Sequence, residues 1–257
     1  MAGLHQLQVS GVERLTKDAV AITFDVPSSL KADFRFQPGQ YLTLSAQIAG
    51  SEVRRSYSIC SAPHEGSLRV GIKALPQGVF STYANSQVRE GDLLDVGVPE
   101  GRFIYVSSPS PKKLMLFAAG SGITPMLSIA KAALKDSPDH QVVLVYGNRS
   151  PESSMFADEI QAMVQNHPHQ FSVVNIYSRA RAEGALFGRI DNANILYVLN
   201  TLHSKMHFDN FYICGPGEMI ETCTQVLEDA GVESTKIHVE HFGGGSAPVA
   251  SDQDGTV

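Results

Sequence analysis

The tetrapeptide Arg55-Ser56-Tyr57-Ser58 combines a cation, a planar ring and two hydroxyls at the end of an alternating strand pattern. An arginine fork can hold a phosphate through paired hydrogen bonds, and an aromatic ring can lie against a flat cofactor. A serine hydroxyl can donate to a ring heteroatom. These residue types favour a cofactor with a phosphate and a flat ring, for which a flavin is the natural candidate. Taken alone, the tetrapeptide leaves open an ordinary half-exposed strand.

A second motif, Gly120-Ser121-Gly122-Ile123-Thr124-Pro125, follows a continuous apolar run. Glycines let a backbone turn sharply near a ligand, and Pro125 suits the first turn of a helix, whose free N–H groups favour a pyrophosphate. The motif differs from the GxGxxG dinucleotide fingerprint, so a tight turn without a ligand stays open. Cys214-Gly215-Pro216-Gly217 has the same combination of glycine and proline after a later strand pattern. Ligands of open α/β sheets lie at that edge of the sheet.

Short strand patterns separated by turn residues fill the first hundred residues. We expect strands at 7–9, 19–24, 41–44, 56–59, 68–73 and 93–96, and one helical turn at 79–85. The close spacing of these strands predicts a six-stranded antiparallel β-barrel over residues 1–106.

The pattern changes after the Pro- and Ser-rich segment 107–112, which is typical of a linker. Continuous apolar strands alternate with helices from 113 to 242, which predicts a doubly wound α/β domain with a parallel sheet. We expect strands at 114–119, 142–146, 171–177, 211–214 and 237–239, and helices at 125–134, 156–165 and 219–230.

Composition restricts the class of protein. Hydrophobic residues make up 43% and charged residues 18% of the 257 positions, as in globular proteins. A net charge of −6 without a basic cluster argues against a nucleic-acid partner. No apolar window approaches the ~20 residues of a membrane span, and the amino terminus lacks a secretory signal pattern, so we expect no membrane insertion and a cytoplasmic location.

The sequence predicts no metal site. The three cysteines, Cys60, Cys214 and Cys223, are too few and too scattered for a disulfide framework or a four-thiolate site. His167-Pro168-His169 has no carboxylate or thiolate partner at ligand spacing.

Six motifs, taken in order, resemble the ferredoxin–NADP reductase superfamily, and within it the reductase components of bacterial multicomponent oxygenases, above all the phenylacetyl-CoA oxygenase reductase type. The resemblance covers nearly the whole chain and implies a barrel that binds FAD and an α/β domain that binds NAD(P)H. The motifs are Arg55-Ser56-Tyr57-Ser58, Gly78-Val79-Phe80-Ser81, residues 120–125, Tyr146-Gly147-Asn148-Arg149, Cys214-Gly215-Pro216 and Glu240-His241-Phe242.

On the flavin side, the resemblance implies that Arg55 holds the pyrophosphate, Tyr57 packs on the isoalloxazine and Ser58 faces the N5 region. Phe242 would shield the flavin or the adenine, unless it is a last core contact. The other residues expected at the flavin are Ser56, Ile72, Lys73, Gly78, Val79 and Ser81. For Lys73, a solvated strand lysine is an equal alternative.

On the coenzyme side, the resemblance implies that Thr124 lies beside the nicotinamide and that Cys214 touches it near the reactive carbon, unless Cys214 is a buried small residue. Ser178 and Arg179 match residues that hold the 2′-phosphate of NADPH, because an arginine suits a dianionic phosphate. NADPH is therefore favoured over NADH. The other residues expected there are Gly120, Pro125, Arg149, Gly215 and Pro216.

The implied reaction is hydride transfer from the nicotinamide to flavin N5, which depends mainly on positioning. We expect Ser58, Cys214 and Glu240 to be catalytic, with Glu240 accepting or relaying a proton unless it is an exposed strand end. Single electrons would then pass to a [2Fe–2S] ferredoxin-like domain or protein that serves an oxygenase or desaturase. The four cysteines of such a cluster are absent from this chain. We therefore expect residues 243–257 to be a flexible tether to a missing ferredoxin-like domain.

Two other functions stay open. A free-standing NAD(P)H:flavin reductase would use flavin as a diffusing substrate. A non-catalytic electron-transfer subunit would keep the fold without binding the coenzyme. FAD is favoured over FMN by the resemblance, and the local residues do not decide between them.

Overall fold

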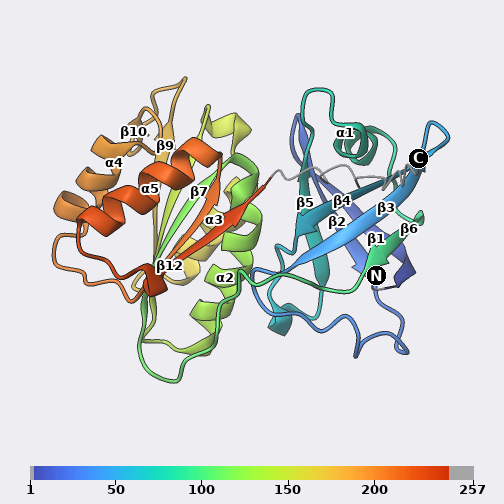
Figure 1. The fold of residues 1–257 in the computed structure, drawn as a ribbon, viewed down its shortest axis with the longest axis horizontal. Helices are drawn as coiled ribbons and strands as arrows, with labels where there is room; N and C mark the ends of the chain where they lie inside the picture. Colours follow the sequence, from blue (N-terminus) through green and yellow to red (C-terminus); the bar gives the residue numbers. More distant parts are fainter. Residues whose placement is uncertain (1–2, 243–257) are drawn as a thin grey trace, which may run out of the picture.

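A computed structural model describes residues 3–242 as two domains that lie side by side (Figure 1). The amino-terminal domain is an antiparallel sheet of six strands in the order β4-β3-β6-β1-β2-β5. The strands are β1 (Leu4–Thr16), β2 (Ala19–Asp25), β3 (Tyr41–Ile48), β4 (Ser51–Ser58), β5 (Leu68–Lys73) and β6 (Leu93–Gly97).

The sheet closes into a barrel just beyond the end of β4. Ile59 forms a bridge with Val70, and the Cys60 N–H donates to the Arg69 carbonyl at 2.8 Å. Alternate apolar residues such as Ile22 and Leu42 fill the interior, and helix α1 (Val79–Ser86) packs its Phe80 into the same core. The predicted six-stranded antiparallel barrel is therefore confirmed.

The carboxyl-terminal domain is a parallel sheet of six strands in the order β10-β9-β8-β7-β11-β12. The strands are β7 (Lys113–Ala119), β8 (Gln141–Asn148), β9 (Phe171–Tyr177), β10 (Leu186–Phe187), β11 (Asn210–Gly215) and β12 (Ile237–His241). The helices are α2 (Ile123–Asp136), α3 (Ala157–Asn166), α4 (Asn192–Tyr197) and α5 (Gly217–Asp229).

Helices cover both faces of this sheet, as its apolar strands predict. On β7, Leu114 and Leu116 pack with α2 and α3, whereas Met115 and Phe117 pack with α4 and α5. The predicted doubly wound α/β domain is confirmed. Strand β10 and helix α4 are additions to the predicted elements, and both are too short to give a periodic apolar pattern.

The two domains share part of one hydrophobic core. Small side chains on the outside of the barrel, including Ala21 and Ala62, belong to the same apolar cluster as helix α2. Figure 1 shows α2 on the side of the sheet that faces the barrel. The Phe103 ring meets the Tyr212 ring edge-on, with centroids 5.5 Å apart. Residues 107–112 contain neither helix nor strand. The expected tether, 243–257, lies outside the described residues.

Candidate functional site

Strand β4 presents the first predicted motif at the rim of the barrel. Arg55 is exposed, and its guanidinium donates to the Arg54 carbonyl at 2.6 Å. Among residues 3–242, no carboxylate forms an ion pair with Arg55, whereas the neighbouring Arg54 pairs with Glu52 at 2.7 Å. The Ser56 hydroxyl is also exposed, 3.4 Å from the hydroxyl of Thr43. The rim therefore offers an uncommitted cation and a hydroxyl to a ligand.

The Tyr57 ring lies half-buried between β4 and α1. Its centroid is 5.6 Å from that of Phe80, and the two rings are tilted by 39°. Burial raises the pKa of the Tyr57 phenol far above its ordinary value, so the group is neutral at physiological pH. Tyr57 therefore presents an anchored, uncharged ring close to Arg55, as stacking on a flat cofactor requires.

The turn before α1 is closed by its own side chain. The Ser81 hydroxyl accepts from the Leu75 N–H at 3.2 Å and donates to the Gly78 carbonyl at 3.4 Å. A Cβ atom at Gly78 would lie 2.4 Å from the Ser81 oxygen, so the turn requires glycine there. Val79 is half-exposed at the helix start, where the first N–H groups have no partner within the helix. This end of α1 suits a phosphate.

Ile72 and Lys73 end strand β5, which precedes this turn. The Ile72 side chain is completely buried in the barrel, and its carbonyl accepts from the Asn85 amide at 3.1 Å. The Lys73 ammonium lies 3.9 Å from the Asp18 carboxylate. Ile72 is thus tied to α1 and Lys73 to the segment between β1 and β2, and their contact with a cofactor stays a prediction.

Strand β12 brings Glu240 within electrostatic range of the barrel. Partial burial raises the pKa of the Tyr41 phenol, and the carboxylates of Glu100 and Glu240 raise it further. Tyr41 pairs in register with Ser58, and Glu240 pairs in register with Cys214 on β11. Ser58 is therefore the strand partner of Tyr41, Glu240 acts on Tyr41 through its charge, and Cys214 is the strand partner of Glu240. Tyr41 itself is not among the residues that the sequence motifs predicted. Only its position after the Pro38-Gly39 turn hinted at a rim location.

Burial is the main cause of the pKa shifts of Glu240 and Cys214. It raises the pKa of the Glu240 carboxyl, and the nearby His241 offsets this rise only in part. The Cys214 side chain is fully buried, and burial together with Glu240 raises the pKa of its thiol. Cys214 is therefore a neutral thiol here rather than a thiolate nucleophile. Ser58 is also buried, whereas Phe242, directly after β12, is 42% exposed.

The two glycine turns of the α/β domain touch each other. A Cβ atom at Gly122 would lie 2.1 Å from the Cys214 carbonyl oxygen, and one at Gly215 would lie 2.6 Å from the Met219 methyl carbon. The turns follow β7 and β11, which are neighbours because the strand order reverses between them. Such a switch point is where open α/β sheets bind ligands. Gly120 adopts a φ of +56°, in the region that favours glycine.

Helix α2 begins at Ile123, two residues before the predicted start. Thr124 is buried, and its hydroxyl donates to the Ser121 carbonyl at 3.0 Å. Pro125 therefore lies inside the first helical turn, where its missing N–H is not needed. Pro216 lies one position outside α5, as its N-cap residue.

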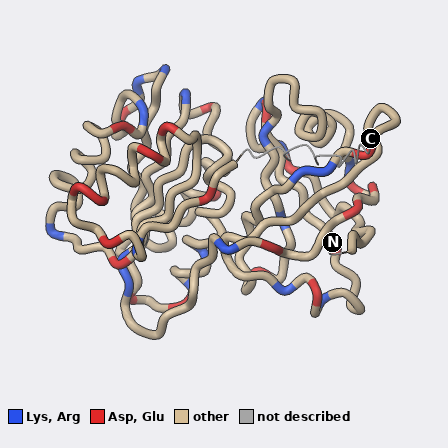
Figure 2. The backbone as a smooth tube through the Cα atoms, viewed as in Figure 1, with Lys and Arg blue, Asp and Glu red and all other residues tan. Residues whose placement is uncertain are grey.

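The ends of β8 and β9 bring the predicted basic residues together. The Arg179 N–H donates to the Arg149 carbonyl at 2.9 Å, and the Ser178 N–H donates to the Asn148 carbonyl at 3.0 Å. Both arginine side chains are exposed. Figure 2 shows Lys and Arg segments at this end of the α/β domain, near β9 and β10. The position suits an anionic group on a bound nucleotide.

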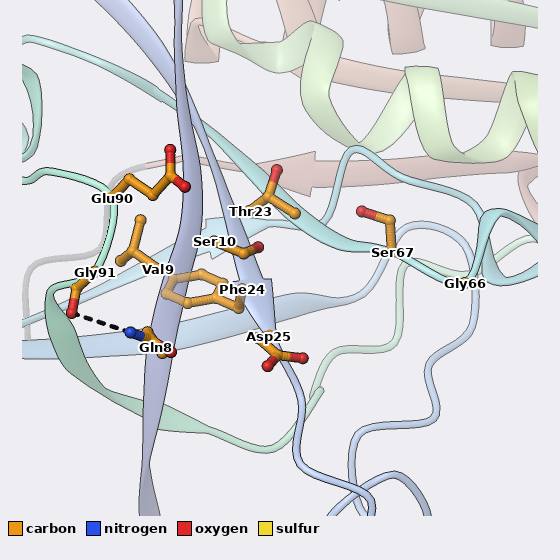
Figure 3. A pocket seen from close by; sticks show the side chains of 10 residues that line it. All are labelled: Gln8, Val9, Ser10, Thr23, Phe24, Asp25, Gly66, Ser67, Glu90 and Gly91. Atoms are coloured by element: carbon orange, nitrogen blue, oxygen red, sulfur yellow. Dashed lines mark hydrogen bonds between the residues drawn. The ribbon is translucent and has the colours of Figure 1, made fainter.

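Two hollows lie apart from the predicted site residues. One, of about 650 Å³, lies beside β1 and β2 of the barrel, and none of the predicted site residues lines it (Figure 3). A hollow of about 360 Å³ lies at the domain seam, beside His64, Lys131 and Met163. Neither hollow contains the predicted site residues, which lie at strand ends and turns.

Comparisons with known proteins agree with this geometry. Residues 6–105 match the oxidoreductase FAD-binding domain family, and residues 116–225 match the oxidoreductase NAD-binding domain family. One of the subunits of 1,2-phenylacetyl-CoA epoxidase from Escherichia coli is 38% identical over 244 residues, which cover 94% of this chain and 68% of that protein. The ferredoxin reductase component of 3-ketosteroid-9-alpha-monooxygenase from Rhodococcus rhodochrous is 33% identical, over 96% of this chain and 67% of that protein.

The fold also matches solved structures. A ferredoxin NADP+ reductase from Neisseria gonorrhoeae, solved with FAD and NADP, superposes with a TM-score of 0.77 over 94% of this chain and 99% of that one, at 24% identity. The chain belongs to the oxidoreductases that join an FAD-binding domain to an NAD-binding domain, and it is a flavoprotein reductase. It spans about two thirds of the length of the curated relatives named above.

Proposed function

We propose that this chain passes hydride from NADPH to bound FAD and then single electrons to a [2Fe–2S] acceptor that serves an oxygenase or desaturase. The observation that carries this proposal is the electrostatic effect of Glu240, on β12, on Tyr41 at the rim of the barrel. It supports a site between Ser58, the register partner of Tyr41, and Cys214, the register partner of Glu240. The two relatives named above, one a part of an epoxidase and one a ferredoxin reductase component of a monooxygenase, support the choice of acceptor.

The residues of the barrel fit a flavin nucleotide. Arg55 is exposed and has no carboxylate partner among residues 3–242, so it is free to pair with a phosphate. The start of α1 provides unpaired N–H groups beyond Gly78. The Tyr57 ring would cover one face of the flavin, which supplies the ability to accept a hydride and release electrons one at a time.

The residues of the α/β domain would admit and orient the coenzyme. Gly122 and Gly215 keep side chains out of the switch point, so that the backbone can approach a pyrophosphate. Arg149 and Arg179 are exposed cations that would hold a 2′-phosphate, which supports NADPH over NADH. Glu240 has a raised pKa because it is partly buried, so it would carry a proton at a higher pH than an exposed glutamate.

The test is anaerobic rapid mixing of the FAD-reconstituted, desalted protein with NADPH or NADH. We expect a yellow protein whose flavin absorbance bleaches at lower concentrations of NADPH than of NADH. A plant-type [2Fe–2S] ferredoxin added afterwards should then be reduced. A protein that loses its flavin on desalting would favour a free-standing flavin reductase. Faster and tighter reduction by NADH would overturn the choice of coenzyme, and an unreduced ferredoxin would overturn the choice of acceptor.

A further inference from the structure

A network of charged side chains joins the two domains at their seam. Arg69 on β5 pairs with Glu159 on α3 at 2.9 Å and with Glu13 on β1. Lys131 on α2 pairs with Glu159 and with Glu65, the latter at 3.0 Å. The side chains of the two cations are only 15% and 10% exposed. Glu159 is thus shared between a cation of the barrel and a cation of its own domain.

Phe156 lies at the centre of this seam in an unusual backbone conformation. Its φ of +59° is in the left-handed region, which a bulky residue rarely adopts. The ring is 3% exposed, and the Arg69 guanidinium carbon lies 5.1 Å from its centroid, within range of a cation–π interaction. Residues are held in such conformations where the surrounding packing determines them strongly.

Gly71, two residues after Arg69 on the same strand, allows the two domains to pack closely because it has no side chain. A Cβ atom there would lie 2.9 Å from the Phe156 ring and 2.7 Å from the Thr124 methyl carbon. Thr124 belongs to the first turn of α2, directly after the glycine turn at 120–122. The backbone of β5 at Gly71 therefore lies directly against Thr124, in the first turn of α2, because glycine has no side chain to separate them.

The loop that ends in Phe156 is also tied to that turn. The Tyr146 hydroxyl lies 3.3 Å from the Gly120 carbonyl oxygen and 3.3 Å from the Met155 carbonyl oxygen, and it can donate to either. Tyr146 is buried, so water does not compete with these carbonyl oxygens for the hydrogen bond from its hydroxyl. One continuous set of contacts thus runs from Arg69 through Phe156 and Met155 to Gly120.

We propose that Arg69 and Gly71 form an interdomain anchor that fixes the distance between the flavin barrel and the turn at residues 120–124, which makes Arg69 a positioning residue for hydride transfer. The inference rests on the proposed function for its catalytic consequence. Hydride transfer needs reacting atoms within about 3–3.5 Å, and a misplacement of about 1 Å can cost about 100-fold in rate. Partly buried ion pairs contribute orientation more readily than net stability.

The experiment compares the full chain with Arg69→Met, Arg69→Lys and the double variant Arg69→Met/Glu159→Gln, which removes both partners of the ion pair between β5 and α3. Arg89→Met is the matched control, because Arg89 is a barrel arginine that donates to carbonyls of its own segment and lies outside the seam. Hydrogen exchange of peptides covering 120–126 is measured without coenzyme. The FAD dissociation constant and the flavin reduction rate at saturating NADPH are measured on the same samples.

We expect Arg69→Met to raise exchange at 120–126 and to lower the reduction rate at least tenfold, with the FAD dissociation constant changed less than about twofold. Arg69→Lys keeps the charge without the planar fork, so its values should fall between those of Arg69→Met and the original protein. If hydrogen exchange at 120–126 and the flavin reduction rate are unchanged in Arg69→Met and Arg69→Lys, the anchor is overturned. It is also overturned if the lower rate is fully explained by loss of bound FAD. If Arg69→Met fails to fold, Arg69→Lys alone decides by the same criteria.

A second variant tests the packing half of the anchor. Gly71→Ala should push Thr124 away from the barrel and lower the reduction rate in the same way, with Gly11→Ala as the control because its added Cβ would meet nothing within 4 Å. An unchanged rate in Gly71→Ala would overturn the role of Gly71. If the original protein is not reduced by NADPH or NADH, the proposed function fails, and the exchange data still decide whether the anchor exists.

Discussion

Arg55 and Arg69 are two arginines of the same barrel, on β4 and β5, that are held in opposite ways. Arg55 is exposed and donates only to the neighbouring Arg54 carbonyl among the described residues. Arg69 is largely buried and pairs with two carboxylates while it lies over the Phe156 ring. The first is available to a ligand, and the second is already paired within the protein.

This difference separates binding from positioning. A cation that binds a phosphate from solution is best left without an internal carboxylate partner. Otherwise the existing ion pair would have to break before the new one forms, and the net gain in binding free energy would be small. A cation that must hold two domains together gains from having every donor satisfied. The rim at Arg55 and the seam at Arg69 should therefore respond differently to substitution.

The largest effect is expected at the rim. Arg55→Ala should weaken FAD binding by about 10- to 100-fold, because the loss of a charged hydrogen-bond partner costs about 1.5–3 kcal/mol. Fluorescence titration of apoprotein with FAD measures this. Arg54→Ala is the matched control, since Arg54 is paired with Glu52 and should leave the affinity within about twofold. Full flavin retention in Arg55→Ala would contradict its role as the phosphate partner.

A smaller effect is expected where the coenzyme meets the sheet edge. Arg179→Gln should reduce the preference for NADPH over NADH by about tenfold, because one exposed cation facing a phosphate contributes about 1–2 kcal/mol. The ratio of the two reduction constants in rapid mixing measures the preference. Arg189→Gln, which removes an exposed arginine that lies near Glu218 at 3.8 Å, is the control. If the ratio stays the same in Arg179→Gln, the assignment to the 2′-phosphate is wrong.

The smallest effect is expected from acid at the seam. Burial works to raise the pKa of Glu159, but the charges and hydrogen bonds of Lys131 and Arg69 outweigh it and lower the pKa below the ordinary 4.5. A carboxyl with a lowered pKa stabilises the folded state fully above its unfolded-state value and loses this contribution as the pH falls through the lowered one. Glu159→Gln should therefore be less stable than the original protein at pH 7, by on the order of 1 kcal/mol or less.

Urea unfolding at a series of pH values measures this difference. The gap between Glu159→Gln and the original protein should narrow as the pH falls below 4.5, the ordinary value of a glutamate. Glu183→Gln, at an exposed position, should show no such dependence. A gap that stays constant down to acid pH would mean that the pairs at Glu159 contribute nothing through its charge.

Much of the fold could be predicted because its signals are local. Strands β5 and β9 have the predicted bounds, since apolar periodicity and flanking turn residues define them within a few positions. Helix α2 was predicted to start at Pro125 because proline is common at the first helical position, but the turn at Gly122 allows an earlier start. Strand β10, with two residues, has no pattern to detect.

The candidate site divides in the same way. The glycine turns and the Arg55 motif were recognisable because each is a short run whose residue types carry the chemistry. Tyr41 was missed because its relation to Glu240 joins positions almost 200 residues apart, and no run of sequence contains both.

Local patterns predicted the two domain types, the glycine turns and the types of residue at each, because propensity and periodicity act over a few neighbouring residues. Which arginine is free and which is paired depends on the packing of distant segments. Arg55 and Arg69 are both strand arginines in the sequence, and only the packing of α3 against β5 places Glu159 and Phe156 beside one of them. Such contacts between distant segments arise from the shape of the whole core, which no local pattern records.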